Sequence, residues 1–470
     1  MSTPHRTQQP LSRRQFLALT GCMATAAVFA ACAPPAGAPA QQAAPQQAAA
    51  TTLVAWFTDR RTINVMTEKE AIPDFMKQNP NIKVEMQFVP ESELQQKLLT
   101  AKAAGNAPDV SSIDETFLDT LTKQEVLLPL PPEVINVKEE MGELTASLYN
   151  ITVKGKEAQY YGLPNGVFAA QLYYNEALLT ELGYKPEDIP AKWDDFLLWA
   201  KEVTKWEGDT LKRSGMAFFA NEYSIFEDLR FEMAGALNGN IFPTKDSNAL
   251  ADEVGVNAWK FIMDLYDVHK LDSKAEGLNS RERFGAGNAV TLYQWSWFNG
   301  FMDTQYPDIK WGLTVPPSMS GQPVFGRRGP DVGFTVTTQK QNQIDQAYKF
   351  YRYLVSPDYL AKYCKLRGVQ PSLKKMWNDP NFSDKSGPHW AAVAYKNRPE
   401  NSVDPGFWPL ELVNIHNRVL PSIRDEGQDI ATALKNAENE GNKFLKANPQ
   451  WSILSTADYK ANPQWLTSGG

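Results

Sequence analysis

Tryptophan side chains are the clearest candidates for ligand chemistry in this chain of 470 residues. All 13 tryptophans lie beyond Cys32, and Trp295 and Trp297 directly follow the apolar run Val290–Tyr293. A flat indole stacks on the apolar C–H face of a sugar ring, while polar neighbours bind its hydroxyls. On a continuing strand the two indoles would share one face. The pattern therefore predicts a stacking surface for a carbohydrate, with core packing as the alternative.

Two further tryptophans are candidates for the same role. Trp56 lies at the end of the expected strand Thr52–Phe57, and Trp408 lies in the segment Gly406–Pro409. Each has core packing as its alternative, because aromatic side chains dominate protein cores.

Polar candidates come from the ends of expected strands and from turns, where ligands sit in open α/β sheets. Arginine and aspartate form charged, directional hydrogen bonds that suit pairs of hydroxyls. Each candidate has a solvated turn residue as its alternative, and Glu232 on an expected helix is a weaker one. The polar candidates are Asp59, Arg60, Asp114, Asn165 and Arg328.

Common enzyme motifs are missing from the sequence. It contains no G-x-S-x-G, no H-E-x-x-H and no G-x-x-x-x-G-K-[ST]. Beyond Cys32 the only histidines in the sequence are His269, His389 and His416, and they are widely separated. Few histidines are thus available for a metal site or a catalytic triad. We expect no enzyme activity, no cofactor and no metal. A glycosidase carboxylate pair stays open, because the 54 acidic residues offer many candidate pairs.

The composition indicates an acidic globular protein. Length favours two domains or one large two-lobed unit. Net charge is −7, and residues 1–31 hold three arginines and no acid, so their removal leaves 44 basic against 54 acidic residues, or −10. An acidic surface argues against nucleic acid and against electrostatic docking on anionic lipid.

The amino terminus has the pattern of an export signal. Ser12–Leu17 reads as a twin-arginine motif, and the apolar run that follows is too short to span a membrane. Phe29-Ala30-Ala31-Cys32 resembles a lipoprotein cleavage box, with Phe29 where leucine is usual. We therefore predict a signal over 1–31 and lipidation at Cys32, with Cys22 or an unlipidated secretory signal as alternatives. Residues 32–50 read as an Ala/Pro/Gln tether.

The folded body begins with alternating strands and helices. Strands are expected at Thr52–Phe57 and Ile82–Phe88 and before Asp114, with helices between them, which is typical of an α/β sheet covered by helices. The stretch Tyr160–Leu178 then starts as a turn, becomes an apolar strand and ends in a helix. Its Pro164-Asn165-Gly166 break predicts backbone that passes between two packed bodies.

These segments carry a resemblance. The similar segments are NPNIKVEMQF, GNAPDV and Leu172-Tyr173-Tyr174-Asn175, the last of these within the pattern Y-G-L-P…L-Y-Y-N-x-x-L. In these segments the chain is similar to the family-1 extracellular solute-binding proteins, the maltose-type binding subunits of ABC importers. The resemblance covers nearly all of residues 52–440. It implies a two-lobed type II periplasmic-binding-protein fold with a mixed sheet and flanking helices in each lobe. Lobe 1 would comprise 51–165 and 315–355, and lobe 2 would comprise 166–314 and 356–470. Its three hinge crossings would fall near Asn165, at Trp311–Pro317 and near Ser356-Pro357.

The resemblance implies a function without a covalent step. A monomeric lipoprotein at the outer face of the cell membrane or in the periplasm would capture a carbohydrate, most simply an oligosaccharide, between its lobes. Closure about the hinge would present it to the permease of an ABC transporter. Two alternatives remain: a binder of polyamine or peptide, and a surface-anchored glycan-degrading enzyme. A polyamine site would require Asp59, Asp114 and Glu232 to converge. The sugar, the permease and the role of the repeated KANPQW segments at 446–451 and 460–465 stay open.

Overall fold

The computed structural model covers most of the predicted body. The predicted signal, both candidate lipidation sites, nearly all of the tether and Trp408 lie outside its described residues. Those residues are 50–141, 149–151, 157–218, 223–235, 238–239, 241–273, 279–321, 326–376, 402–403, 410–449 and 455–461.

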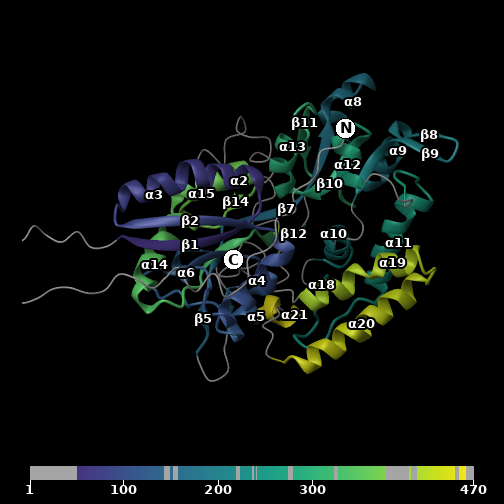
Figure 1. Ribbon diagram of the computed structural model, residues 1–470. Coiled ribbons are helices and arrows are strands. Elements are labelled where there is room, and N and C mark those ends of the chain that lie inside the picture. Colours follow the sequence, from purple (N-terminus) through teal and green to yellow (C-terminus); the bar gives the residue numbers. More distant parts are fainter. Residues whose placement is uncertain are drawn as a thin grey trace, which may run out of the picture. The chain divides into compact units, whose positions relative to one another are not determined.

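The first sheet has the strand order β2-β1-β3-β13-β6 (Figure 1). Its strands β1, β2 and β3 run parallel, and β13 lies antiparallel to both β3 and β6. The predicted alternation of strand and helix at the start of the body is therefore correct. The strands are β1 (Thr51–Thr58), β2 (Ile82–Val89), β3 (Val110–Ile113), β6 (Leu163–Pro164) and β13 (Gly333–Val336), with a separate pair β4 (Asn150–Ile151) and β5 (Gln159–Tyr160).

Helices on this part of the chain present apolar faces to the sheet. Phe334 of β13 lies 4.8 Å from Phe57 and 5.8 Å from Tyr359, measured between ring centroids. The helices are α2 (Arg61–Met66), η1 (Thr67–Ala71), α3 (Ile72–Gln78), α4 (Glu91–Ala103), α5 (Glu115–Lys123), α6 (Val137–Glu140), η4 (Gln341–Gln343), α14 (Ile344–Leu354), α15 (Pro357–Arg367) and η5 (Lys374–Met376).

The second sheet is mixed and has the order β15-β12-β7-β10-β9-β8, with β11 and β14 also paired to β7. Its central strand β7 is antiparallel to β10, and β10 is parallel to β9. The strands are β7 (Gly166–Asn175), β8 (Lys205–Glu207), β9 (Thr210–Phe218), β10 (Ala289–Trp295), β11 (Trp311–Thr314), β12 (Gly326–Pro330), β14 (Gln370–Pro371) and β15 (Ser402–Val403).

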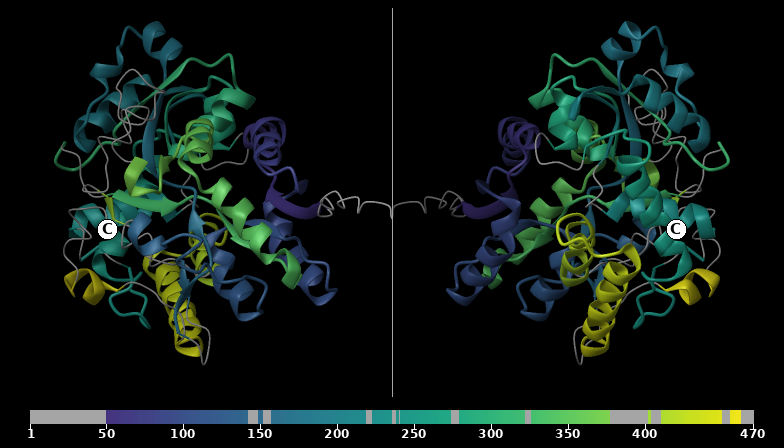
Figure 2. Two further views of the ribbon diagram at one scale, coloured as in Figure 1. Left: turned by 90° about the vertical axis from the view of Figure 1, so that its left-hand side faces the viewer. Right: turned by 90° about the vertical axis from the view of Figure 1, so that its right-hand side faces the viewer.

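The helices that follow the second-sheet strands include the long amphipathic helix α20 (Figure 2). Its buried residues Ala433, Leu434, Ala437 and Leu445 recur at helical spacing, and the last three join the core that contains Trp259. These helices are α8 (Glu176–Glu181), η2 (Pro186–Asp188), α9 (Trp193–Val203), α10 (Tyr223–Ala234), α11 (Glu253–Asp267), α12 (Ser280–Gly285), η3 (Ser296–Phe298), α13 (Asn299–Gln305), α18 (Leu410–Asn417), α19 (Val419–Arg424), α20 (Ile430–Ala447) and α21 (Thr456–Ala461).

Two chain segments pass between the sheets side by side. The amide of Asn165 donates to the carbonyl of Val332 at 3.4 Å, and the amide of Asp331 donates to the carbonyl of Gly166 at 2.8 Å. Because β6 pairs with β13 on one side and β7 with β12 on the other, these bonds form one antiparallel ladder from the first sheet to the second. The chain thus leaves the first sheet at Asn165, where a crossing was predicted.

The other two crossings lie later in the chain than predicted. Strand β11, at the predicted second crossing, still pairs with β7, and the chain returns to the first sheet only at Asp331-Val332. Pro357 occupies the first turn of α15 after the cap Ser356, so it starts a helix rather than a crossing. The Tyr359 hydroxyl of that helix lies 3.0 Å from Thr67, near the first sheet.

The third passage follows α15, where β14 pairs with β7. The contacts of α15 favour assigning it to lobe 1, although it falls within 356–470, which we predicted to be lobe 2. The lobe boundaries themselves stay predictions.

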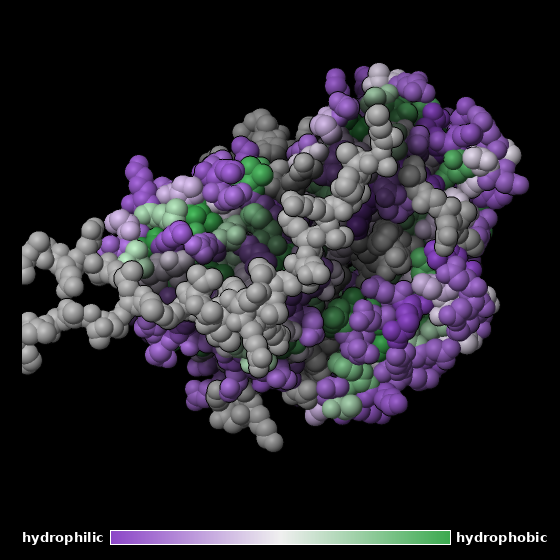
Figure 3. Space-filling model, viewed as in Figure 1, coloured by the Kyte–Doolittle hydropathy of each residue, from purple (hydrophilic) through white to green (hydrophobic). Residues whose placement is uncertain are grey.

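The surface is mainly polar. Hydrophilic residues cover most of the described face in Figure 3, and hydrophobic ones form small separate groups. Large exposed hydrophobic side chains such as Leu198 and Val65 lie on different helices, which is ordinary for a globular protein. Within the described ranges, no helix combines the length and the apolar character needed to span a membrane.

Candidate functional site

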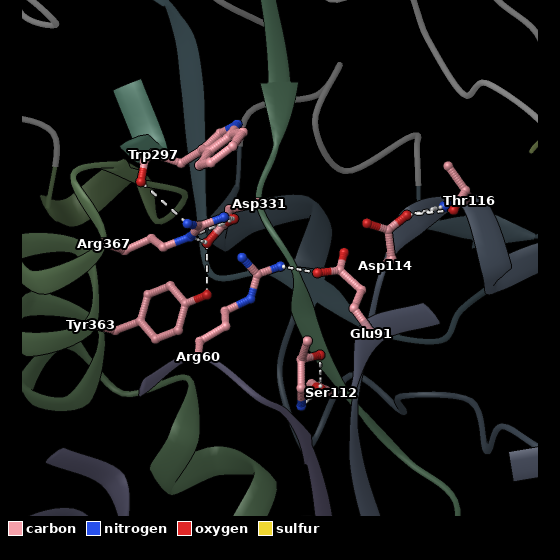
Figure 4. A network of polar contacts seen from close by, with 10 residues as sticks. Arg60, Glu91, Ser112, Asp114, Thr116, Trp297, Asp331, Tyr363 and Arg367 are labelled. Atoms are coloured by element: carbon pink, nitrogen blue, oxygen red, sulfur yellow. Dashed lines mark hydrogen bonds and ion pairs between the residues drawn. The ribbon is translucent and has the colours of Figure 1, made fainter. Parts of the chain in front are cut away.

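Charged side chains meet where the parallel strands of the first sheet end. Arg60 follows β1, Glu91 opens α4 after β2, and Asp114 follows β3. The carboxyl ends of neighbouring parallel strands share one edge of the sheet, so the sequence brings these three residues together. Figure 4 shows Arg60 pointing toward Glu91 and Asp331. We call the set Arg60, Glu91, Asp114, Asp331, Tyr363, Arg367 and Trp297 the Arg60 cluster.

Arg60 is the cation at the centre of the cluster. Its Nη2 donates to Glu91 Oε2 at 3.1 Å, and its side chain is 18% exposed. Burial acts to lower its pKa, but the surrounding Asp331, Glu91, Tyr363 and Asp114 together raise that pKa. Its Nε is buried and has no hydrogen-bond partner among the described residues. A guanidinium has five N–H donors, so Arg60 keeps donors for a ligand.

Asp331 lies on the second passage between the sheets and is 1% exposed. Arg367 Nη2 donates to its Oδ1 at 3.1 Å, and the Tyr363 hydroxyl donates to its Oδ2 at 2.7 Å. Burial acts to raise the pKa of Asp331, but the charges of Arg367 and Arg60 outweigh it and hold this pKa below its usual value. Asp331 therefore stays ionised and fixes α15 to the crossing.

Trp297 connects this network to the second sheet. Arg367 Nη1 donates to its carbonyl at 3.2 Å. The guanidinium carbons of Arg281 and Arg367 lie 4.9 and 5.1 Å from its ring centroid, within the range of cation–π attraction. The indole is half-buried, so part of it remains open to solvent.

The predicted shared strand face for the two indoles is wrong. Strand β10 ends at Trp295, and Trp297 lies in the 3-10 turn η3. Trp295 is 5% exposed and meets Phe168 edge-on at 4.9 Å between centroids. The chain turns immediately after Trp295, so alternation of side chains does not extend to Trp297.

The remaining predicted residues fall into separate places. Asp114 caps α5 by accepting from the Thr116 amide at 3.0 Å, while its charge also acts on Arg60. Asp59 is exposed and accepts from Asn64 Nδ2 at 2.7 Å. Trp56 is half-buried against a hydrophobic cluster of the first sheet. The backbone of Arg328 pairs with Ala169, and its side chain lies outside the described atoms, as does all of Trp408.

Asn165 is fully buried at the first crossing. Both its side-chain Oδ1 and Nδ2 lack a hydrogen-bond partner within the described structure, while the Cys364 thiol donates to its carbonyl at 3.4 Å. Its position beside Asp331 follows from the ladder between the two passages.

Sequence reasoning missed Glu91, Asp331, Tyr363 and Arg367. Glu91 had the same signal as Arg60, because it follows the end of an alternating strand. The other three had no local signal: Asp331 is positioned by the crossing ladder, and α15 brings Tyr363 and Arg367 to it. Among described residues, no group of three or more His, Cys, Asp or Glu side chains is arranged to hold a metal ion.

Two sheets joined by three passages, with a charged cluster at the strand ends beside those passages, define a two-lobed binding protein. The bacterial extracellular solute-binding protein family matches residues 70–389, and the chain belongs to this family. The predicted family is thus confirmed, and membership makes the chain an exported solute-binding protein.

Similar proteins agree with this family. The chain is 23% identical over 347 residues to an arabinooligosaccharide-binding protein of Halalkalibacterium halodurans, covering 71% of this chain and 74% of the relative. It is 23% identical over 326 residues to a lactose-binding protein of Rhizobium radiobacter, covering 66% and 72%. An ABC transporter solute-binding protein from Thermotoga lettingae, solved with α-D-tagatose, superposes with a TM-score of 0.68 at 20% identity, covering 84% of this chain and all of that one. The predicted periplasmic-binding-protein fold is confirmed.

Proposed function

We propose that this protein is the substrate-binding lipoprotein of an ABC transporter that captures a carbohydrate, most simply an oligosaccharide, and delivers it to a membrane permease. The observation that carries the proposal is the Arg60 cluster, in which three strand ends, a crossing and an indole supply directional donors, acceptors and an aromatic surface at one place. Relatives that bind arabinooligosaccharides and lactose support the same ligand class.

The charge of the cluster favours a neutral ligand. Arg60, Arg367 and the neighbouring Arg281 are balanced by Glu91, Asp114 and Asp331. A ligand with net charge would upset this balance in a partly desolvated place, whereas hydroxyl groups accept from guanidinium and donate to carboxylate without adding charge. Sugar rings carry such hydroxyls next to apolar faces that suit Trp297.

The alternatives have less support. A polyamine site needs Asp59, Asp114 and Glu232 together, but each has a separate partner: Asn64 for Asp59, Thr116 for Asp114 and the Met319 amide for Glu232. A peptide ligand stays a second candidate, since Arg60 and Glu91 could bind its termini. An enzymatic function finds no counterpart in the family, whose members are solute-binding proteins.

Ligand capture would proceed by closure about the three passages, in which contacts from both sheets stabilise the closed form. The test is thermal unfolding of residues 51–470 with a panel of mono- and oligosaccharides, polyamines and peptides. A sugar at about 100 times its Kd should add about 2.7 kcal/mol of stability. A shift with peptides or polyamines and none with sugars would overturn the carbohydrate assignment, and consumption of the sugar would establish an enzyme.

Export and anchoring follow from the amino terminus in this proposal. We expect the twin-arginine signal to direct export and Cys32 to carry the lipid, with the Ala/Pro/Gln tether between the anchor and the body. Replacing Cys32 with serine should release the protein from the membrane fraction, while Cys22→Ser should leave it bound. Release by Cys22→Ser alone would move the anchor to that residue.

A further inference from the structure

Several hydrogen-bonding atoms on one face of the second sheet are buried and unpaired. Gln171 of β7 and Gln294 of β10 are 0% and 1% exposed, and Asn299 of α13 is 3% exposed. Both amide atoms of Gln171, Nε2 of Gln294 and Nδ2 of Asn299 have no hydrogen-bond partner among the described residues. We call these three side chains the amide cluster.

The register of the sheet brings the two glutamines together. Gln171 and Gln294 are directly opposite in the antiparallel pair β7–β10, so their Cβ atoms lie about 4.5–5.5 Å apart on the same face. Tyr173, two residues along β7, shares that face. Its hydroxyl donates to Asn299 Oδ1 at 2.6 Å and lies 3.0 Å from the Trp295 carbonyl, which places Asn299 over the same part of the sheet.

The hydrogen bonds that are made fix the orientation of two amides. Gln294 Oε1 accepts from the Trp295 amide at 2.8 Å, and Asn299 Oδ1 accepts from Tyr173. Their NH2 groups are therefore the unpaired ends. The cluster offers NH2 donors from three side chains and one carbonyl acceptor, from Gln171.

This donor and acceptor set defines the chemistry of its ligand. A cation would meet mainly N–H groups, and an apolar group would leave the three NH2 groups and the Gln171 carbonyl unsatisfied at a high free-energy cost. A hydroxyl-type oxygen accepts two hydrogen bonds and also donates, so it can join facing amides that do not bond each other.

We propose that the amide cluster is a buried binding site for hydroxyl-type oxygen, supplied either by bound water or by a hydroxyl of the captured solute. The second source rests on the proposed carbohydrate function, and the first does not. In either case the oxygen links strand β7, which continues the first crossing, to strand β10 and helix α13.

The test is a double-mutant cycle with methionine, which matches glutamine in length and lacks its polar atoms. Gln171→Met and Gln294→Met should each lower Tm by about 1–3 °C, because each leaves the shared oxygen and the other amide short of partners. The double variant should lower Tm by no more than the larger single change. Gln78→Met, at an exposed position on α3, is the matched control and should leave Tm unchanged.

Water-proton relaxation dispersion and sugar titration separate the two sources. If water supplies the oxygen, a long-lived water signal present in the wild type with and without sugar should be lost in the double variant, with Kd unchanged. If the solute supplies it, sugar should displace that signal and Gln171→Met should weaken sugar binding by about tenfold or more. If Gln171→Met and Gln294→Met each raise Tm, and their effects add in the double variant while the water signal and the Kd for sugar stay unchanged, the amide cluster is not an oxygen-binding site. Failure of every sugar to bind would contradict the proposed function. The double-mutant cycle and the water signal would still show whether the amide cluster binds an oxygen.

Discussion

Replacing Asp331 with alanine is expected to lower the free energy of unfolding by about 3–5 kcal/mol, because two largely desolvated guanidiniums lose a buried counter-charge. Asp331 accepts from Arg367 and Tyr363 and also faces Arg60. Its removal leaves two guanidiniums without their shared counter-charge and frees α15 from the crossing. Denaturant-induced unfolding at neutral pH measures the loss.

The matched control is Asp358→Ala, an exposed carboxylate in the first turn of the same helix. Its exposed charge lies at the start of the helix dipole and near Tyr353, so its loss should cost less than about 1 kcal/mol. Equal effects of the two substitutions would mean that Asp331 has no special role in holding α15.

The effect of Asp331 should also depend on pH in a defined direction. The folded protein holds the pKa of Asp331 below its usual value, so the ionised carboxylate stabilises the fold above the unfolded pKa of about 3.9. This contribution is lost as pH falls through the lower, folded pKa. The difference in stability between wild type and Asp331→Asn should therefore shrink in acid below about pH 4. A difference that stays constant down to unfolding in acid would contradict the assigned charge interaction.

The strand ends of the first sheet were predictable because local patterns determine them. Alternating apolar residues place β1 and β2, and parallel pairing then brings Arg60 and Asp114 to one edge. The same argument applies to Glu91, which follows the end of β2 and which sequence reasoning omitted.

The other half of the site could not be read from local patterns. Asp331 lies between β12 and β13, and their pairings with β7, β6 and β3 reach more than a hundred and fifty residues back along the chain. Arg367 reaches it from helix α15, whose Pro357 was predicted to mark a crossing but instead lies in the first helical turn. Pairings of this kind are set by topology, so the crossings after the first were predicted too early.

The tryptophans show a different limit. The number and placement of the tryptophans predicted which indoles are candidates for ligand stacking, but the exposure of each indole depends on where β10 stops. The 3-10 turn after Trp295 turns Trp297 toward Arg281 and Arg367 and leaves Trp295 against Phe168. A strand that ended two residues later would have given both indoles one face.

Replacing Arg60 with alanine is expected to weaken sugar binding by roughly 10–150-fold, the loss of about 1.5–3 kcal/mol for a hydrogen bond to a charged group. Arg60 is half-buried at the strand ends, has a buried Nε without a partner in the described chain, and uses Nη2 for Glu91. The other N–H groups of Arg60 are therefore the ones that would donate hydrogen bonds to the hydroxyl oxygens of a sugar. Titration calorimetry with the sugar found by the unfolding panel measures the change in Kd.

Two further variants show whether Arg60 acts on the ligand or only on the fold. Arg60→Lys keeps the charge beside Glu91 and Asp331 but loses the planar fork, so it should retain stability and still bind sugar more weakly. Arg352→Ala removes an exposed arginine of α14 and should change neither property. A lower Tm for Arg60→Ala with unchanged Kd would assign Arg60 to structure alone. The ligand would then have to be held by Trp297 and the second-sheet side of the crossing, because removal of the Arg60 guanidinium beside Glu91 would have left binding unchanged.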